Sequence, residues 1–247
     1  MRRALTCALA CALLIGGCAR PFPGEAGGSA SAGRANATDS YSRWSETAAP
    51  EYYLVIGASH IDQQLEPGTV SYTPLDELHR AGRATACISY EMMEAGRARE
   101  RQDISDLHPS GWGHNAEVAI ALSNGSTYHG MFWNRSHLIA KSLGGADALE
   151  NLVTGTRMQN VGSNSRGGSS GGMAYAEGLA RNWLEAHPTG NLMYVATPVY
   201  EGNELVCRSV FVDLLSSDGS LDLRIEVFNA AKGFDIDYAT GEFWETR

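Results

Sequence analysis

The segment from Trp133 to Asn160 brings together a histidine, an arginine and two amides. His137 follows Arg135 at the end of a predicted strand, and Asn151 and Asn160 lie in the next segment. Histidine can act as a general base at neutral pH because its unperturbed pKa is about 6.5. An amide oxygen suits a hard divalent cation, and a guanidinium binds phosphate. These residue types therefore predict metal-assisted hydrolysis of a phosphodiester.

The stretch from Trp133 to Glu177 resembles a known family, the DNA/RNA non-specific endonucleases of the ββα-metal (His-Me finger) superfamily. It is most similar to their secreted and DNA-entry nuclease branch, which carries an Asp-Arg-Gly-His motif. This chain has Asn-Arg-Ser-His at residues 134–137. A weaker similarity runs from about Leu75 to the end of the chain, and it includes Asn115 and residues 232–242.

The resemblance implies a role for each matching position. His137 corresponds to the general base, Asn160 to the metal ligand, and Asn151 to a second asparagine of the catalytic site. Glu177 corresponds to an acid that reaches the metal through water, and Arg135 to the arginine that contacts phosphate. The implied cofactor is Mg²⁺, with Mn²⁺ as a substitute. Because an asparagine ligand is neutral, we expect weak metal binding and a requirement for excess divalent ion.

The chain departs from the family motif at two positions. Asn134 replaces the usual aspartate, which removes a carboxylate near the metal. Ser136 replaces glycine, so the turn expected there must accept a side chain. Arg157 and Arg166 are further candidates for substrate binding. Arg166 lies in the glycine- and serine-rich run 162–172, which is either a loop that closes on nucleic acid or a simple connection.

Each of these residues also has an ordinary structural interpretation. Asn151 and Asn160 could be turn or cap residues, which is the usual use of asparagine. Glu177 could be a solvated helix residue, and Arg135 could form a surface ion pair of little energetic value. The spacing of the two asparagines behind His137 favours the functional interpretation.

The amino terminus has the pattern of an export signal. Two arginines precede an apolar run from Ala4 to Ile15, and Ile15-Gly16-Gly17-Cys18 resembles a bacterial lipobox. We expect residues 1–17 to be a lipoprotein-type signal peptide and Cys18 to carry lipid; the alternative is an ordinary cleaved secretory signal. The Gly/Ala/Ser-rich residues 18–50 predict a flexible tether, and residues 51–247 the nuclease domain. The protein is then exported and anchored to a membrane, or released outside the cell.

The charge and the cysteines of the expected mature chain set further limits. The full chain carries −9, and loss of the two arginines in residues 1–17 leaves −11. This charge argues against strong non-specific adhesion to nucleic acid, but it allows a nuclease whose basic residues line one cleft. Cys87 and Cys207 either form a disulfide, as in many exported proteins, or remain buried free thiols.

Hydrophobic patterns predict an α+β fold with a mainly antiparallel sheet, and the resemblance adds a ββα-metal finger as its core. Residues 75–93 have spacing compatible with one or two helices, and Met173–His187 is the clearest helix. Strands are expected at residues 52–56, 118–122, 131–135, 192–200, 205–214 and 221–228.

The combined interpretation is an exported endonuclease that cleaves DNA, with RNA as a second candidate substrate. Low sequence preference is expected, because phosphate contacts carry no base information. The family resemblance implies 5′-phosphorylated products. One alternative is a catalytically silent nucleic-acid-binding lipoprotein of the same fold. Another is a surface interaction domain that binds protein or glycan.

Overall fold

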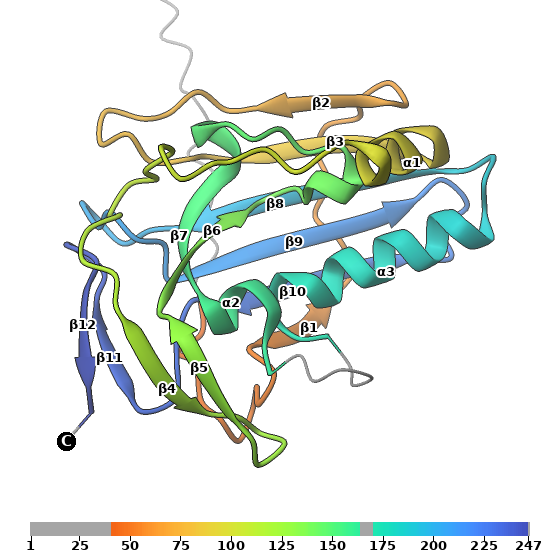
Figure 1. Cartoon of the computed structure of the whole chain (residues 1–247). Helices are drawn as coiled ribbons and strands as arrows, with labels where there is room; N and C mark the ends of the chain where they lie inside the picture. Colours follow the sequence, from red (N-terminus) through yellow and green to blue (C-terminus); the bar gives the residue numbers. More distant parts are fainter. Residues whose placement is uncertain (1–40, 164–169, 247) are drawn as a thin grey trace, which may run out of the picture. The chain divides into compact units, whose positions relative to one another are not determined.

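The computed structural model describes residues 41–163 and 170–246. The largest sheet in these ranges has six antiparallel strands in the order β1-β10-β9-β8-β3-β2 (Figure 1). Its strands are β1 (Tyr53–Gly57), β2 (Thr69–Tyr72), β3 (Ala84–Ser89), β8 (Asn191–Val199), β9 (Ser209–Ser216) and β10 (Asp222–Phe228). The strands predicted at 52–56, 192–200, 205–214 and 221–228 correspond to β1, β8, β9 and β10.

Helix α3 (Gly172–Ala186) covers one face of this sheet across β8, β9 and β10 (Figure 1). Ala176, Ala180 and Leu184 recur every four residues and are completely buried against the sheet. Alternate residues of β9, such as Val210 and Val212, supply the facing apolar surface. The prediction of a helix at residues 173–187 is therefore confirmed.

The ββα finger consists of β6 (Trp133–His137), β7 (Leu152–Thr156) and α2 (Arg157–Val161). β6 and β7 pair antiparallel, with His137 opposite Leu152. Helix α2 follows β7 directly, and the Thr156 hydroxyl caps it by accepting a 2.9 Å hydrogen bond from the backbone N–H of Gln159. The predicted α+β class with a ββα-metal finger core is confirmed.

A buried asparagine, Asn229, ties the finger to the large sheet. Its Oδ1 accepts a hydrogen bond from the Thr156 N–H at 2.8 Å. Its Nδ2 donates to the backbone carbonyl groups of Thr154 and Cys207, at 2.9 Å each. Since the side chain is fully buried, these bonds do not compete with water, and they fix the end of β7 relative to β9 and β10.

Two hairpins complete the described fold beside the finger. They are β4 (Glu117–Ala121) with β5 (Thr127–Met131), and β11 (Phe234–Asp237) with β12 (Glu242–Glu245). Phe132 joins them, because its ring stacks on Phe243 at a centroid distance of 3.9 Å and meets the edge of Trp133 at 4.7 Å. β4 and β6 confirm the strands predicted near residues 118–122 and 131–135.

The prediction of one or two helices at residues 75–93 was wrong for residues 75–89. Residues 75–83 form a turn and irregular chain rather than a helix. Residues 84–89 form β3, which lies between β2 and β8, and only α1 (Tyr90–Ala98) is helical. The Ser89 hydroxyl starts this helix by accepting a hydrogen bond from the Met92 N–H at 3.2 Å. A short apolar run such as 84–88 is buried on both faces, so its periodicity does not distinguish a central strand from a helix.

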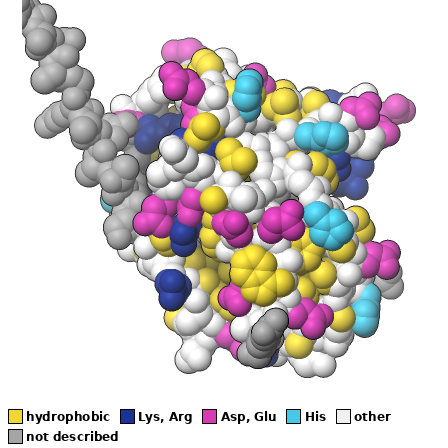
Figure 2. All heavy atoms as spheres, turned by 90° about the vertical axis from the view of Figure 1, so that its left-hand side faces the viewer, with side chains coloured by type: hydrophobic (Ala, Val, Ile, Leu, Met, Phe, Trp, Pro, Cys, Tyr) yellow, Lys and Arg dark blue, Asp and Glu magenta, His cyan; other side chains and the backbone are white. Residues whose placement is uncertain are grey.

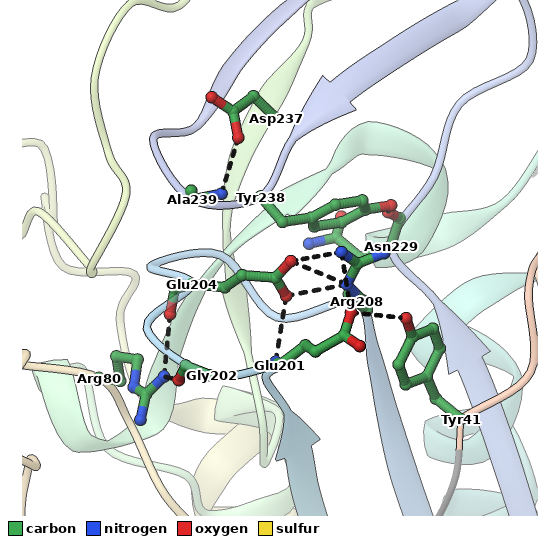
Figure 3. Close-up of polar contacts among 10 residues, drawn as sticks. All are labelled: Tyr41, Arg80, Glu201, Gly202, Glu204, Arg208, Asn229, Asp237, Tyr238 and Ala239. Carbon is green, nitrogen blue, oxygen red and sulfur yellow. Dashed lines mark hydrogen bonds and ion pairs between the residues drawn. The ribbon is translucent and has the colours of Figure 1, made fainter.

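The predicted tether extends too far, because residues 41–50 pack on the folded unit. The Tyr41 hydroxyl donates to Glu201 at 3.1 Å, and Figure 3 shows both beside Arg208, which Glu201 and Glu204 hold. Trp44 stacks on Tyr52 at 4.9 Å.

The expected signal peptide, its lipidated cysteine Cys18 and residues 18–40 lie outside the described residues. None of the helices in the described ranges is long and apolar enough to cross a membrane.

The two remaining cysteines are buried free thiols, so the disulfide alternative is not realised in this structure. The sheet register gives the reason. Cys87 in β3 lies opposite Met193, whereas Cys207 follows the end of β8 at Val199. Six strand residues at roughly 3.3 Å each separate the two levels by about 20 Å, far more than a disulfide spans.

Candidate active site

An open cleft of about 1010 Å³ lies between the finger, β5, α3 and the loop that follows α1. It contains most of the residues that the sequence singled out. The polar and charged lining residues are Arg101, Gln102, Asp103, Ser105, Asn115, Asn134, Arg135, His137, Lys141, Ser142, Asp147, Arg157, Asn160 and Glu177.

His137 lies at the end of β6, and its side chain is 18% exposed. Its Nε2 is 2.8 Å from Oδ1 of Asp147, while Nδ1 has no hydrogen-bond partner among the described residues. Burial lowers the pKa of His137, and the hydrogen bond and charge of Asp147 act in the opposite direction. The imidazole is therefore neutral near pH 7 with Nδ1 available as a base, as a general base requires.

Asn160 in α2 faces the same cleft beside Asn134 of β6. The Ser136 hydroxyl donates to Asn160 Oδ1 over a long 3.3 Å, and Asn160 Nδ2 lies 3.5 Å from Asn134 Oδ1. These contacts are weak, so the oxygen of Asn160 keeps capacity for another ligand. The side chain of Ser136 is fully buried within β6, rather than in a turn, and it fits because Gly155 on β7 has no side chain.

Glu177 reaches the cleft from α3, with a side chain that is 16% exposed. Burial raises the pKa of its carboxyl group, and the cation of Arg181 lowers it less. The Arg181 Nη1 atom is 3.5 Å away, which is long for an ion pair. Glu177 is thus a sheltered carboxyl group that a cation in the cleft would favour in its ionised form.

The guanidinium of Arg135 is held mainly by backbone carbonyl groups of the loop after α1. Its Nε donates to the Leu107 carbonyl at 2.5 Å, a second nitrogen donates to the Ser105 carbonyl, and the group lies 4.1 Å above the Trp112 ring. Arg135 therefore orders the loop after α1 as well as lining the cleft. It is not the exposed ion pair of the alternative interpretation.

Arg157, the first residue of α2, is the less constrained cation. It lies 5.2 Å from the Tyr128 ring centroid, and its buried Nη1 has no hydrogen-bond partner among the described residues. Burial lowers the pKa of Arg157, and it has no carboxylate partner within the described ranges. A half-buried guanidinium with unused donors, one helical turn from Asn160, is well suited to bind a phosphate.

Asn151 does not face the cleft. Its side chain is fully buried, and all its hydrogen bonds go to the backbone. Oδ1 accepts from the Ile139 N–H at 2.9 Å, and Nδ2 donates to the carbonyl groups of Ile139 and Ala146 at 2.9 and 2.8 Å. The structure thus places Asn151 behind the cleft, where it joins the chain after His137 to the loop 144–148.

Replacement of Asn151 by alanine should therefore destabilise the protein. The buried backbone groups of Ile139 and Ala146 would lose their partners, so we expect the free energy of unfolding to fall by roughly 3 kcal/mol. Urea denaturation measures this change. The variant Asn203→Ala, at an exposed loop position, serves as the control and should change stability by no more than about 0.5 kcal/mol.

Sequence reasoning missed Asp147, Arg101 and Lys141. An acid ten residues after the histidine, in a glycine-rich turn, carries no recognisable spacing signal. Arg101 and Lys141 join Arg135 and Arg157 in the cleft, so cations outnumber acids there although the chain is acidic overall. By contrast, the described residues on the side of the molecule that carries β11 and β12 form no continuous basic surface (Figure 2). Arg166 lies outside the described residues.

The sequence pattern of the DNA/RNA non-specific endonuclease family matches residues 66–238. The chain belongs to this family. The endonuclease is 32% identical over 240 residues to a deoxyribonuclease of Streptococcus dysgalactiae subsp. equisimilis, across 77% of this chain and 72% of the relative.

Solved structures agree with this assignment. The Sda1 nuclease, determined with a bound zinc ion, matches the endonuclease with a TM-score of 0.77 at 33% identity, over 83% of this chain and all of the other. NucA from Streptococcus agalactiae, determined with a magnesium ion, has a TM-score of 0.58 at 23% identity, over 76% of this chain and 84% of its own. The match to NucA shows a common fold. The match to the Sda1 nuclease shows similarity in sequence as well.

Proposed function

We propose that the endonuclease hydrolyses phosphodiester bonds of DNA, and of RNA as a second substrate, with His137 as general base and one divalent metal ion. The observation that carries the proposal is the convergence of His137, Asn160, Glu177 and Arg157 on one cleft. One strand, β6, and two helices, α2 and α3, contribute these residues, so their meeting is not a local sequence effect.

The donor chemistry of the cleft fits a hard divalent cation. Within the described residues, no group of three or more histidine, cysteine or acidic side chains could hold a metal. The available donors are the oxygens of Asn160 and Glu177, with Asn134 beside them. A set of few oxygen donors suits Mg²⁺, which keeps several waters, and Mn²⁺ would bind similarly. The zinc ion bound to the similar Sda1 nuclease supports a divalent metal in this family.

In the proposed reaction, Nδ1 of His137 takes a proton from the attacking water. A divalent cation held by Asn160, with Glu177 in its water shell, would stabilise charge on the phosphorane and the leaving 3′ oxygen. Arg157 binds the scissile or adjacent phosphate, and Arg135 fixes the neighbouring wall. Loss of the 3′ oxygen leaves the phosphate on the 5′ side. Arg166 remains a candidate phosphate contact.

A plasmid-nicking assay tests this proposal. We expect cleavage with Mg²⁺, none with excess EDTA, and recovery when Mg²⁺ is restored. Mass spectrometry of oligonucleotide products should show 5′-phosphate and 3′-hydroxyl ends. Cleavage that survives EDTA, or products with 3′-phosphate ends, would contradict the mechanism.

The variant Arg157→Met should weaken substrate binding more than turnover. One phosphate contact is lost, so we expect KM for DNA to rise about tenfold and the slope of log KM against log salt to fall by about one. Steady-state kinetics over a range of NaCl concentrations measure both. Arg83→Met removes the same charge from a surface pair with Asp62 and should leave kcat and KM unchanged. An unaltered salt slope in Arg157→Met would contradict the assignment.

We also propose that the protein is exported and anchored through lipid on Cys18, which the motif at residues 15–18 supports. Mass spectrometry of the mature protein should show a chain that begins at Cys18 and carries acyl groups. A chain that begins at another residue without lipid would indicate ordinary secretion.

A further inference from the structure

We infer that Asp147 is a positioning residue that orients His137 through a His–Asp pair. The inference rests on the proposed function, because it concerns how the assigned base is held. Asp147 Oδ1 is 2.8 Å from His137 Nε2, and the two side chains are 15% and 18% exposed. A carboxylate only accepts hydrogen bonds, so its partner Nε2 carries the proton and Nδ1 is left as the base.

The loop that carries Asp147 is fixed on both sides of this residue. Asn151 Nδ2 donates to the Ala146 carbonyl at 2.8 Å, and the Ala146 N–H donates to the hydroxyl of Tyr72 on β2 at 2.9 Å. The Gly145 carbonyl accepts a hydrogen bond from Arg99 at 2.5 Å. Asp147 is therefore held at a defined place rather than at the end of a free surface loop.

The same asparagine also holds the histidine side of the pair. The Asn151 backbone carbonyl accepts from the Leu138 N–H at 2.8 Å, and its Oδ1 accepts from the Ile139 N–H at 2.9 Å. Asn151 thus bonds the residues directly after His137 and directly before Asp147. This gives the fully buried asparagine a function in the site: it sets the separation of the imidazole and the carboxylate.

Asp147 would contribute in two ways. It restricts the imidazole to one tautomer and one orientation, and it stabilises the imidazolium that forms when Nδ1 accepts a proton from water. Other charges also act on His137. Arg99 and Arg101, in the segment after α1, oppose protonation. Arg135, Lys141, Arg157 and Glu177 line the same cleft. Asp147 is the acid that contacts the ring.

The variant Asp147→Asn tests the inference by two readouts. We expect kcat for plasmid cleavage to fall about 100-fold while KM for DNA and the half-saturating Mg²⁺ concentration stay within about twofold, because the inferred role of Asp147 is to hold His137 and not to bind substrate or metal. Loss of the carboxylate should also lower the pKa of His137, measured by proton NMR of the metal-free protein. The acid limb of the kcat–pH profile should move to lower pH accordingly.

Two matched variants complete the design. Glu150→Gln removes the same charge three residues away, outside the cleft lining and the hydrogen bonds to His137, and should leave kcat and the His137 pKa unchanged. Asp147→Glu keeps the charge on a longer side chain and should recover part of kcat. If Asp147→Asn folds poorly by circular dichroism, Asp147→Ser replaces it in the same comparison.

The outcomes separate this inference from the proposed function. If the wild type cleaves DNA, His137→Ala does not, and Asp147→Asn keeps full kcat with an unchanged His137 pKa, the positioning role is overturned and the proposed function stands. If the wild type shows no metal-dependent cleavage, the proposed function fails. The NMR comparison then still decides whether Asp147 controls the ionisation of His137.

Discussion

Replacement of His137 by alanine should lower kcat about 1000-fold, the largest single effect that we expect. A positioned general base contributes about 10²- to 10⁴-fold, and no other group in the described residues presents an unprotonated imidazole to the cleft. KM for DNA should change little, because the cations that bind phosphate remain. Steady-state cleavage of a fluorogenic oligonucleotide at saturating Mg²⁺ measures both constants.

The control for this variant is His129→Ala, which removes an exposed histidine from β5 outside the cleft lining. It should retain wild-type kcat. The pH profile adds an independent check. Because burial lowers the pKa of His137, the base stays deprotonated to lower pH than a free histidine, and the acid limb of wild-type kcat should lie below pH 6.5. Persistent cleavage by His137→Ala would show that another group takes the proton.

Replacement of Asn160 by alanine should have the second-largest effect, through metal binding. In the proposed site Asn160 would supply one of few protein oxygens, so we expect the half-saturating Mg²⁺ concentration to rise more than tenfold and kcat at the highest Mg²⁺ to fall about 100-fold. Removal of metal by EDTA should abolish wild-type activity. Isothermal titration with Mn²⁺, without substrate, measures the loss of binding directly.

Two further variants show whether the effect belongs to the metal. Asn160→Asp should tighten Mn²⁺ binding, since a carboxylate attracts the cation, yet lower kcat, since it reduces the charge available to the phosphorane. Asn203→Ala, in an exposed loop, should change neither quantity. Equal Mn²⁺ affinity in wild type, Asn160→Ala and Asn160→Asp would remove Asn160 from the metal site.

Most strands and the main helix could be predicted from sequence because their signals are local. The spacing of Ala176, Ala180 and Leu184 marks the buried face of α3, and the turn residues 216–219 mark the boundary between β9 and β10. β3 could not be predicted in the same way. Its residues are buried on both faces, and its place between β2 and β8 depends on strands from distant parts of the chain.

For the site, the sequence alone determined the family, and it predicted the chemistry of a histidine base and an amide ligand. Only the tertiary structure decided which residues act together. It placed Asn151 behind the cleft rather than in it, left Cys87 and Cys207 as separate thiols, and brought Asp147 to His137. The physical reason is that residue types and local periodicity depend only on positions that are close together in the sequence. A contact between a loop acid and a strand-end imidazole depends on how buried hydrogen bonds, here those of Asn151, fold the intervening chain back on itself.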